Sequence, residues 1–212
     1  MSSLSQILAE HGSLLVLDAT GTAQAAYWPA PDASPRLARE EGEMGVALFH
    51  AVQRVCPKLD EPGAFAFAEA PGSILGIRTA ATALRVWTTL RPRPVYGFNA
   101  LELAAERGGP ARAWIADARR GRWHVLVPGQ RVRQAARDEL ETARGAWPLA
   151  TLAGYRHWEP LPPGTETASY DLGPLLAGAA HANLFQLREQ PDAALSAEPS
   201  YVQWTPRIHQ AP

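Results

Sequence analysis

Residues 64–84, AFAFAEAPGSILGIRTAATAL, form the most legible unit of the sequence, a strand that turns directly into a helix. The first six residues are an apolar run that ends in Glu69, which indicates a buried strand. Pro71-Gly72-Ser73 then turns the chain, and Ser73 is a good helix N-cap. The helix has one apolar side, formed by Ile74, Ile77, Ala81 and Leu84. A strand that leads into a helix in this way is typical of α/β proteins.

Further strands and helices are expected on both sides of this unit. Before it, the pattern predicts a short helix at 5–10, strands at 13–18, 23–28 and 36–40, and a helix over Met44–Val55. After it, the pattern predicts a strand at 95–98 and a helix at 100–107. This succession predicts a mixed α/β unit with one three-layered core.

Gly108-Gly109-Pro110 is the best boundary between two units, residues 1–107 and residues 108–212. The second unit is less regular in pattern. Its predicted elements are a hairpin of strands at 113–117 and 123–127, a helix at 134–144, a mainly irregular stretch at 147–169, a helix at 172–187 and a strand at 201–204.

Composition restricts the function. With a net charge of −1 over 212 residues, the chain has no excess charge to hold RNA phosphates or an anionic membrane, so any nucleic-acid contact must be local or made by a partner. Cys56 is the single cysteine, which excludes an internal disulfide and favours a cytoplasmic location. The first twelve residues do not resemble a signal peptide, and no apolar run approaches the ~20 residues of a membrane span.

Motifs for common catalytic and metal chemistries are missing. No two of the six histidines are three or four residues apart, which excludes a helical two-histidine metal pair and leaves open a zinc site built from distant residues. Lys58, the only lysine, lies in no glycine-rich loop, so the P-loop pattern is absent. The segment from Gly72 to Gly76 has the wrong spacing for a serine nucleophile elbow. We therefore predict no catalytic residue, no metal and no cofactor.

Three residues are candidates to face a nucleotide or another anion. Asp18 ends the first predicted strand, where a carboxylate can hold a metal–nucleotide complex or act as a base, but it can also cap the turn at Thr20. Gly72 and Ser73 open a helix, where unpaired N–H groups can bind an anion, but they can also form only a tight turn and its cap. Both interpretations stay open.

Arginines provide two further candidates for binding a partner or RNA. Arg78, one turn after Ser73, could pair with Asp18 or Glu69, or could face a partner. A small basic cluster in the second unit could touch RNA by charge and stacking, or could be a solvated hairpin tip. This cluster consists of Arg119, Arg120, Arg122 and Trp123.

Five segments, in the same order and at similar spacings, resemble the TsaB (YeaZ) family. Residues 69–80 are similar to the family's Gly-Pro-Gly-Ser-Phe-Thr-Gly-Leu-Arg segment, which also follows a strand and opens a helix. The other four are 15–20 (a strand ending in Asp-Thr-Ser), 98–104 (Ser-Ser-Leu-Glu-Ala-Leu-Ala), 115–121 (Ile-Asp-Ala-Arg-Arg) and 198–202 (Pro-x-Tyr-Leu). The chain departs from the family at Glu43-Met44-Gly45, where His-Ser-Glu is frequent, and at Ile74-Leu75, where the family has Phe-Thr.

The resemblance implies an actin/Hsp70/sugar-kinase-like (ASKHA) fold with two related lobes. It also implies a non-catalytic subunit that pairs with a TsaD-type homologue and a TsaE-type ATPase, so that the complex transfers a threonylcarbamoyl group to an adenosine of tRNA. Contact with tRNA would then be only indirect, and the free chain could form a homodimer or stay a monomer. The alternative function is an active phosphotransferase or ATPase on the same fold; a peptidase lacks its nucleophile and metal motifs.

The two long helices of the first unit would form the contact with the TsaD-type partner. If Leu48, Val52 and Val55 face the sheet of their own unit, helical spacing directs Val46, Phe49 and Gln53 elsewhere. The same reasoning applies to the second helix. The candidate interface residues are Val46, Phe49, Gln53, Leu75, Arg78 and Trp87. The alternative is that the second half of the chain covers them.

Overall fold

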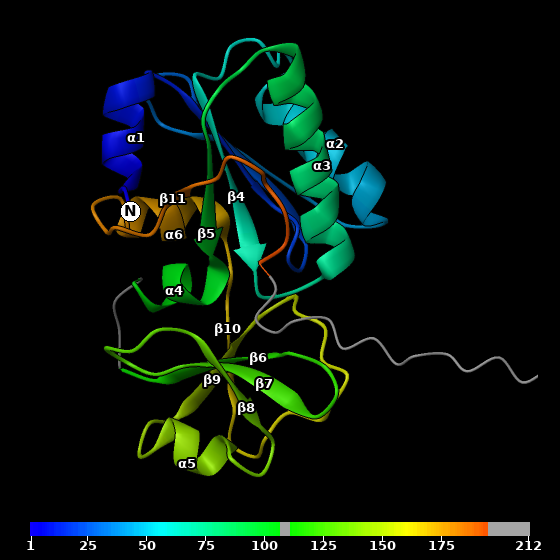
Figure 1. Ribbon diagram of the computed structural model, residues 1–212, viewed down its shortest axis with the longest axis vertical. Coiled ribbons are helices and arrows are strands. Elements are labelled where there is room, and N and C mark those ends of the chain that lie inside the picture. The colour runs from blue at the N-terminus through cyan, green and yellow to red at the C-terminus, as the bar shows by residue number, and fades with distance from the viewer. Residues whose placement is uncertain (107–110, 195–212) are drawn as a thin grey trace, which may run out of the picture.

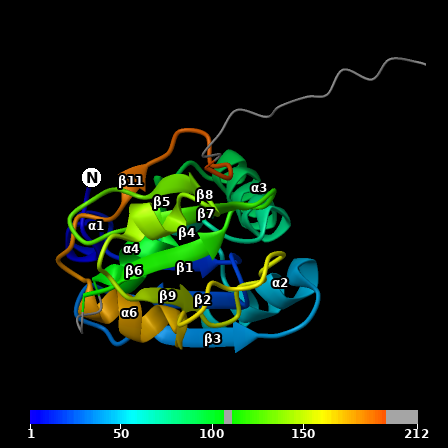
Figure 2. The same cartoon turned by 90° about the horizontal axis from the view of Figure 1, so that it is seen from below.

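The computed structural model describes residues 1–106 and 111–194. The segment at 108–110, the family-like segment at 198–202 and the predicted strand at 201–204 lie outside these ranges. Within them the chain forms two mixed β-sheets with helices around them (Figure 1, Figure 2). The predicted mixed α/β fold is confirmed.

The helices are α1 (Leu4–His11), α2 (Met44–Val55), α3 (Ile74–Leu90), α4 (Ala100–Ala105), α5 (Leu140–Arg144) and α6 (Leu172–Gly178). The first sheet has the order β11-β5-β4-β1-β2-β3. Its strands are β1 (Leu14–Asp18), β2 (Ala23–Trp28), β3 (Arg36–Glu40), β4 (Ala64–Ala70), β5 (Val95–Asn99) and β11 (Gln186–Leu187). The second sheet has the order β10-β9-β6-β7-β8. Its strands are β6 (Ala113–Asp117), β7 (Arg122–Leu126), β8 (Arg133–Ala136), β9 (Leu149–Leu152) and β10 (Glu166–Ala168).

Strand β1 lies in the centre of the first sheet, antiparallel to β2 and parallel to β4. Its side chains alternate between two apolar layers. Leu15 and Leu17 pack with α2 and α3, whereas Leu14 and Val16 pack with α1, α4 and α6. Because both faces are covered, the strand is apolar throughout, as the continuous run in the sequence predicts.

The second sheet also has a covered face on each side. Trp114, Leu126 and Leu152 join the core that α4 and α6 share with the first sheet. On the other face, Ile115, Trp123 and Val125 form a separate core with α5. The two sheets are therefore packed through a common apolar layer.

Two helix predictions in the second half were wrong, and the irregular stretch predicted between them is confirmed. The predicted helix at 134–144 consists of strand β8, a turn and the short α5, because pairing with β7 overrides the helical preference of the alanines. The stretch at 147–169 is mainly irregular, as predicted, and it also contains the short strands β9 and β10. The predicted helix at 172–187 ends at Gly178, where glycine disfavours helix, and the chain continues to β11.

The last described segment returns to the first sheet. α6 packs against the layer below β1 and β2, and β11 pairs antiparallel with β5. The division into units at residues 107 and 108 stays a prediction, and each sheet receives segments from late in the chain (Figure 1).

Candidate functional site

The Asp18 carboxylate lies at the end of the central strand β1 and is fully buried. Its Oδ1 accepts hydrogen bonds from the backbone N–H of Thr20 (2.8 Å) and from the Thr20 hydroxyl (2.6 Å). Asp18 therefore caps the turn that follows its own strand.

Two tyrosines from the second half of the chain close over this carboxylate. The Tyr170 hydroxyl donates to Oδ2 of Asp18, and the Tyr155 hydroxyl lies 2.7 Å from the Thr20 hydroxyl. The two rings meet edge to face, with their centroids 5.9 Å apart. We call Asp18, Thr20, Tyr155 and Tyr170 the tyrosine network. It leaves Asp18 no exposed atom, so a nucleotide could reach this carboxylate only if the tyrosines moved.

Burial dominates the electrostatics of the tyrosine network. It raises the pKa of Asp18 above the ordinary value, and the hydrogen bonds from Thr20 and Tyr170 oppose that shift. Burial also raises the pKa of both tyrosines well above 10, with a further contribution from the Asp18 carboxylate. Both phenols therefore stay protonated.

The turn at Gly72 and Ser73 is fixed against the same Thr20. The backbone N–H of Ser73 donates to the Thr20 carbonyl (2.7 Å), and the Ser73 hydroxyl accepts from the N–H of Gly76 (3.2 Å). Gly72 has φ +139°, and a Cβ there would lie 2.4 Å from the Thr20 carbonyl oxygen, which only glycine tolerates. The structure thus brings Asp18, Gly72 and Ser73 together around Thr20, and the N–H groups of Ser73 and Gly76 are used within the protein.

Arg78 is exposed on α3 and contacts neither of the acids considered from the sequence. Its Nε lies 3.8 Å from a carboxylate oxygen of Asp192. Glu69 instead pairs with Arg188, whose pKa is raised by this hydrogen-bonded carboxylate.

The predicted interface residues of α2 and α3 lie mostly on the surface. The exposed fraction is 50 % for Val46, 44 % for Phe49 and 75 % for Leu75, and Gln53 is also exposed. Trp87 is half-buried, with its ring centroid 6.4 Å from Phe49. Within the described parts of the chain, the second half leaves these side chains uncovered.

Two further apolar side chains extend this surface along α3. Val86 is 53 % exposed and Leu90 is 82 % exposed. We call Val46, Phe49, Leu75, Val86, Trp87 and Leu90 the α2–α3 face. α2 and α3 contact one another on the side of the first sheet opposite α1, α4 and α6 (Figure 1). Sequence reasoning missed Val86 and Leu90, although both lie off the inward stripe of Ile77, Ala81 and Leu84.

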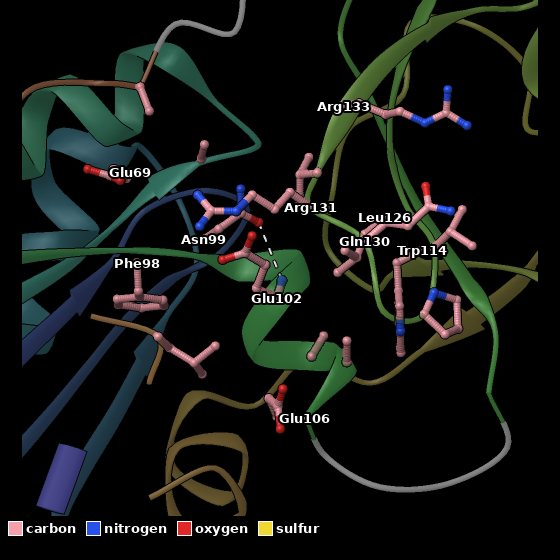
Figure 3. A pocket seen from close by; sticks show the side chains of 18 of the residues that line it. Glu69, Phe98, Asn99, Glu102, Glu106, Trp114, Leu126, Gln130, Arg131 and Arg133 are labelled. Carbon is pink, nitrogen blue, oxygen red and sulfur yellow. Dashed lines mark hydrogen bonds between the residues drawn. The ribbon is translucent and has the colours of Figure 1, made fainter. Parts of the chain in front are cut away.

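A cavity of about 1090 Å³ opens between α4 and the connection from β7 to β8 (Figure 3). Glu69, Asn99 and Glu102 line it from the first sheet and α4, and Trp114 and Arg131 line it from the second sheet. Burial raises the pKa of Glu102, and the Arg131 guanidinium opposes that shift. The Asn99 side chain accepts from the N–H of Leu101 (2.9 Å) and caps α4. The sequence analysis did not single out this cavity.

Among residues 1–106 and 111–194, no group of three or more His, Cys, Asp or Glu side chains is placed to hold a metal ion. No helix in those ranges is long and apolar enough to cross a bilayer.

Comparison with solved structures identifies the architecture. YeaZ from Pseudomonas aeruginosa superposes with a TM-score of 0.58 and 21 % identity, over 80 % of this chain and 90 % of that one. This chain has the YeaZ fold. An uncharacterized Pseudomonas aeruginosa protein described as similar to the peptidase YeaZ gives a TM-score of 0.53 at 21 % identity, over 79 % of this chain and 90 % of that one. No protein-family model and no curated protein matches the sequence.

The YeaZ fold agrees with the family resemblance in the sequence. The tyrosine network joins the end of β1 to the segments that follow β9 and β10. The sequence analysis missed Tyr155 and Tyr170, because they stand in irregular segments without a motif.

Proposed function

We propose that this protein is a non-catalytic scaffold subunit for threonylcarbamoyl transfer to an adenosine of tRNA, in the cytoplasm. It would act with a TsaD-type catalytic homologue and a TsaE-type ATPase. The observation that carries the proposal is the α2–α3 face, together with the YeaZ fold and the five family-like segments of the sequence.

The α2–α3 face has the composition of a protein–protein interface. Its apolar side chains come from two adjacent helices, and Phe49 packs edge to face on Trp87, which in turn lies over Phe65. Aromatic side chains of this kind often dominate binding energy. Covering the exposed half of one such side chain is worth about 1 kcal/mol. Exposed apolar residues on two helices that contact each other therefore favour a helix-on-helix contact.

The buried Asp18 carboxylate supports a role without catalysis. Both oxygens of Asp18 accept hydrogen bonds inside the protein, so this carboxylate is not placed as a base or as a metal ligand. A phosphotransferase or ATPase would need a nucleotide beside Asp18, where the Tyr155 and Tyr170 hydroxyls instead bond to Thr20 and Asp18. Transfer chemistry is therefore assigned to the TsaD-type partner, and the α2–α3 face of a free chain would pair with a second copy.

Phe49→Asp tests the proposal. A charge at this half-exposed position should abolish co-purification with the TsaD-type homologue of the same organism, and should leave the melting temperature nearly unchanged, because the Phe49 side chain is not in the core. The matched control is Leu187→Asp, an exposed apolar residue on β11 that lies outside the α2–α3 face.

Two results would contradict the proposal. One is normal co-purification of the Phe49→Asp variant, which would place the partner elsewhere. The other is ATP turnover by the repurified chain that disappears in an Asp18→Ala variant, which would favour the phosphotransferase alternative.

A further inference from the structure

An exposed tryptophan after β9 has two arginines close to its ring. Trp158, in the loop after β9, is 57 % exposed. The guanidinium carbon of Arg156 is 4.0 Å from the centroid of its ring, and that of Arg119 is 5.3 Å away. Arg119 comes from the hairpin between β6 and β7, so two separate loops build this arrangement. We call Arg119, Arg156 and Trp158 the Trp158 cluster.

Asp117, at the end of β6, holds the two loops together. Its Oδ1 accepts from the backbone N–H of Arg119 (2.6 Å), and its Oδ2 accepts from those of Trp158 (2.6 Å) and Glu159 (3.0 Å). The two segments lie side by side at the end of the second sheet (Figure 1). One carboxylate thus positions both the hairpin tip and the tryptophan.

The backbone of the hairpin tip is held in an uncommon conformation. Arg119 and Arg120 have φ +64° and +53°, in the left-handed region that non-glycine residues rarely adopt. Such a conformation costs about 1 kcal/mol or more for each residue and persists where the surroundings enforce it. Here it directs a basic segment toward the exposed indole.

The cluster has a local excess of positive charge. Within the described ranges, neither Arg119 nor Arg156 forms an ion pair with a carboxylate. Among the nearby acids, Asp117 accepts the three backbone N–H groups, and Glu159 faces Arg137 at 3.6 Å. Arg119 and Arg156 are therefore available to an anionic ligand, although the net charge of the chain is only −1.

We infer that the Trp158 cluster binds a single-stranded RNA segment, with one unpaired base stacked on the indole and the neighbouring phosphates held by Arg119 and Arg156. Single-stranded RNA is bound by stacking of its bases on aromatic rings and by charge attraction of its phosphates to basic side chains. The indole of Trp158 and the two guanidinium groups near it provide both interactions. Arg119 is the more distant of the two arginines, at 5.3 Å from the ring centroid. The RNA base would take the place of the Arg119 guanidinium on the ring, and Arg119 would then bind a neighbouring phosphate. A duplex offers no unstacked base and fits less well.

This inference deepens the proposed function, because tRNA is the substrate assigned there to the complex. It departs from the expectation of purely indirect tRNA contact. The basic cluster proposed from the sequence contained Trp123 as its aromatic residue. Trp123 is buried, and the exposed aromatic residue next to Arg119 is Trp158.

Fluorescence anisotropy of a labelled RNA hairpin with an unpaired loop tests the inference on the full-length chain at about 50 mM salt, where phosphate contacts are strong. Trp158→Ala should weaken binding roughly tenfold, as expected for the loss of one base stack. Arg119→Ala should weaken binding and should lower the dependence of log Kd on log salt by about 0.7, the value for one single-strand phosphate contact.

Two matched variants serve as controls. Trp147→Ala removes another exposed tryptophan of the same lobe, and Arg36→Ala removes an arginine over the Tyr27 ring, 5.8 Å from its centroid, in the first sheet. Both should bind the hairpin like the unchanged chain. A fully paired duplex of equal length should bind at least tenfold more weakly than the hairpin, because it lacks the unstacked base.

The inference is wrong if the unchanged chain does not bind the hairpin saturably, if Trp158→Ala binds as tightly as the unchanged chain, or if Trp147→Ala loses as much affinity. Loss of a protein partner by Trp158→Ala with unchanged RNA binding would assign the cluster to a protein instead. The two proposals fail separately. Phe49→Asp should leave hairpin binding intact, and Trp158→Ala should leave co-purification with the TsaD-type homologue intact.

Discussion

The two oxygens of Asp18 bond to different parts of the chain. Oδ1 holds Thr20 two residues away, and Oδ2 receives the phenol of Tyr170 from 152 residues further along. One buried carboxylate therefore fixes a local turn and also joins the first sheet to the segment after β10. A buried carboxylate oxygen without a hydrogen-bond partner destabilises the fold, because burial has removed the water that would otherwise donate to it.

Tyr170→Phe should lower the free energy of unfolding by about 1–3 kcal/mol, because it removes the donor and leaves Oδ2 of Asp18 buried without a partner. Tyr155→Phe should cost less, about 0.5–1.5 kcal/mol, since the Thr20 hydroxyl keeps its bond to Asp18. Urea denaturation measures both. A Tyr170→Phe variant as stable as the unchanged chain would show that the tyrosine network is not a structural joint.

His124 on β7 makes the stability of the fold depend on pH. Burial lowers its pKa to about 4, although nearby Asp117 opposes that shift. Between pH 6.5 and a pH of about 4, His124 binds a proton in the unfolded chain but not in the folded chain. The stability that the fold has above pH 6.5 is therefore lost progressively as the pH falls through this range.

Replacing His124 by Gln should remove this pH dependence. The unfolding free energy of the unchanged chain relative to His124→Gln should fall by about 1–3 kcal/mol from neutral pH to a pH near 4. Chemical denaturation at a series of pH values measures the difference. A difference that stays constant over that range would mean that His124 takes up its proton equally well in the folded chain.

At the scale of elements, the first half could be predicted closely, and in the second half the β6–β7 hairpin could be predicted but β8, β9 and β10 could not. β1, β4 and α2 are marked by unbroken apolar runs or a clear helical stripe, because the side chains of the strands and of one helix side are buried. β8 has only two apolar residues, and β9 has only four residues in all. Their positions are set by pairing with β7 and β6, which no local pattern records.

The candidate sites divide in the same way. The exposure of Val46, Phe49 and Leu75 follows from helical spacing alone, so a sequence can indicate it. Tyr155, Tyr170 and Trp158 gain their roles only from contacts across the fold, with Thr20, Asp18 and Arg119 respectively. No spacing in the sequence predicts such pairs.

At the scale of the whole molecule, the late segments α6 and β11 complete the first sheet. α6 buries Leu172, Leu175 and Leu176 in the layer that also contains Leu14 and Val16 of β1. Phe185 packs on Phe98, with ring centroids 5.4 Å apart. The core beside the first sheet therefore includes residues that follow the second sheet in the chain.

A fragment of residues 1–107 should consequently fail to unfold cooperatively on heating and should bind a hydrophobic dye, because the face of β1 and β4 that α6 covers becomes exposed. A fragment of residues 1–194, which retains α6 and β11, is the control. Circular dichroism and dye fluorescence make the comparison. A sharp transition in the shorter fragment at the midpoint of the longer one would show instead that residues 1–107 form an independent domain.

The return of the chain to β5 also sets the order of events on the ribosome. β5 is hydrogen-bonded only by β4 until residues 186–187 have been synthesised, and its other edge stays open while the second sheet is being made. An open strand edge can pair with another nascent chain on the same messenger RNA. Translation speed over residues 111–185 should therefore influence how much of the protein reaches the native state, because it sets how long that edge remains unprotected.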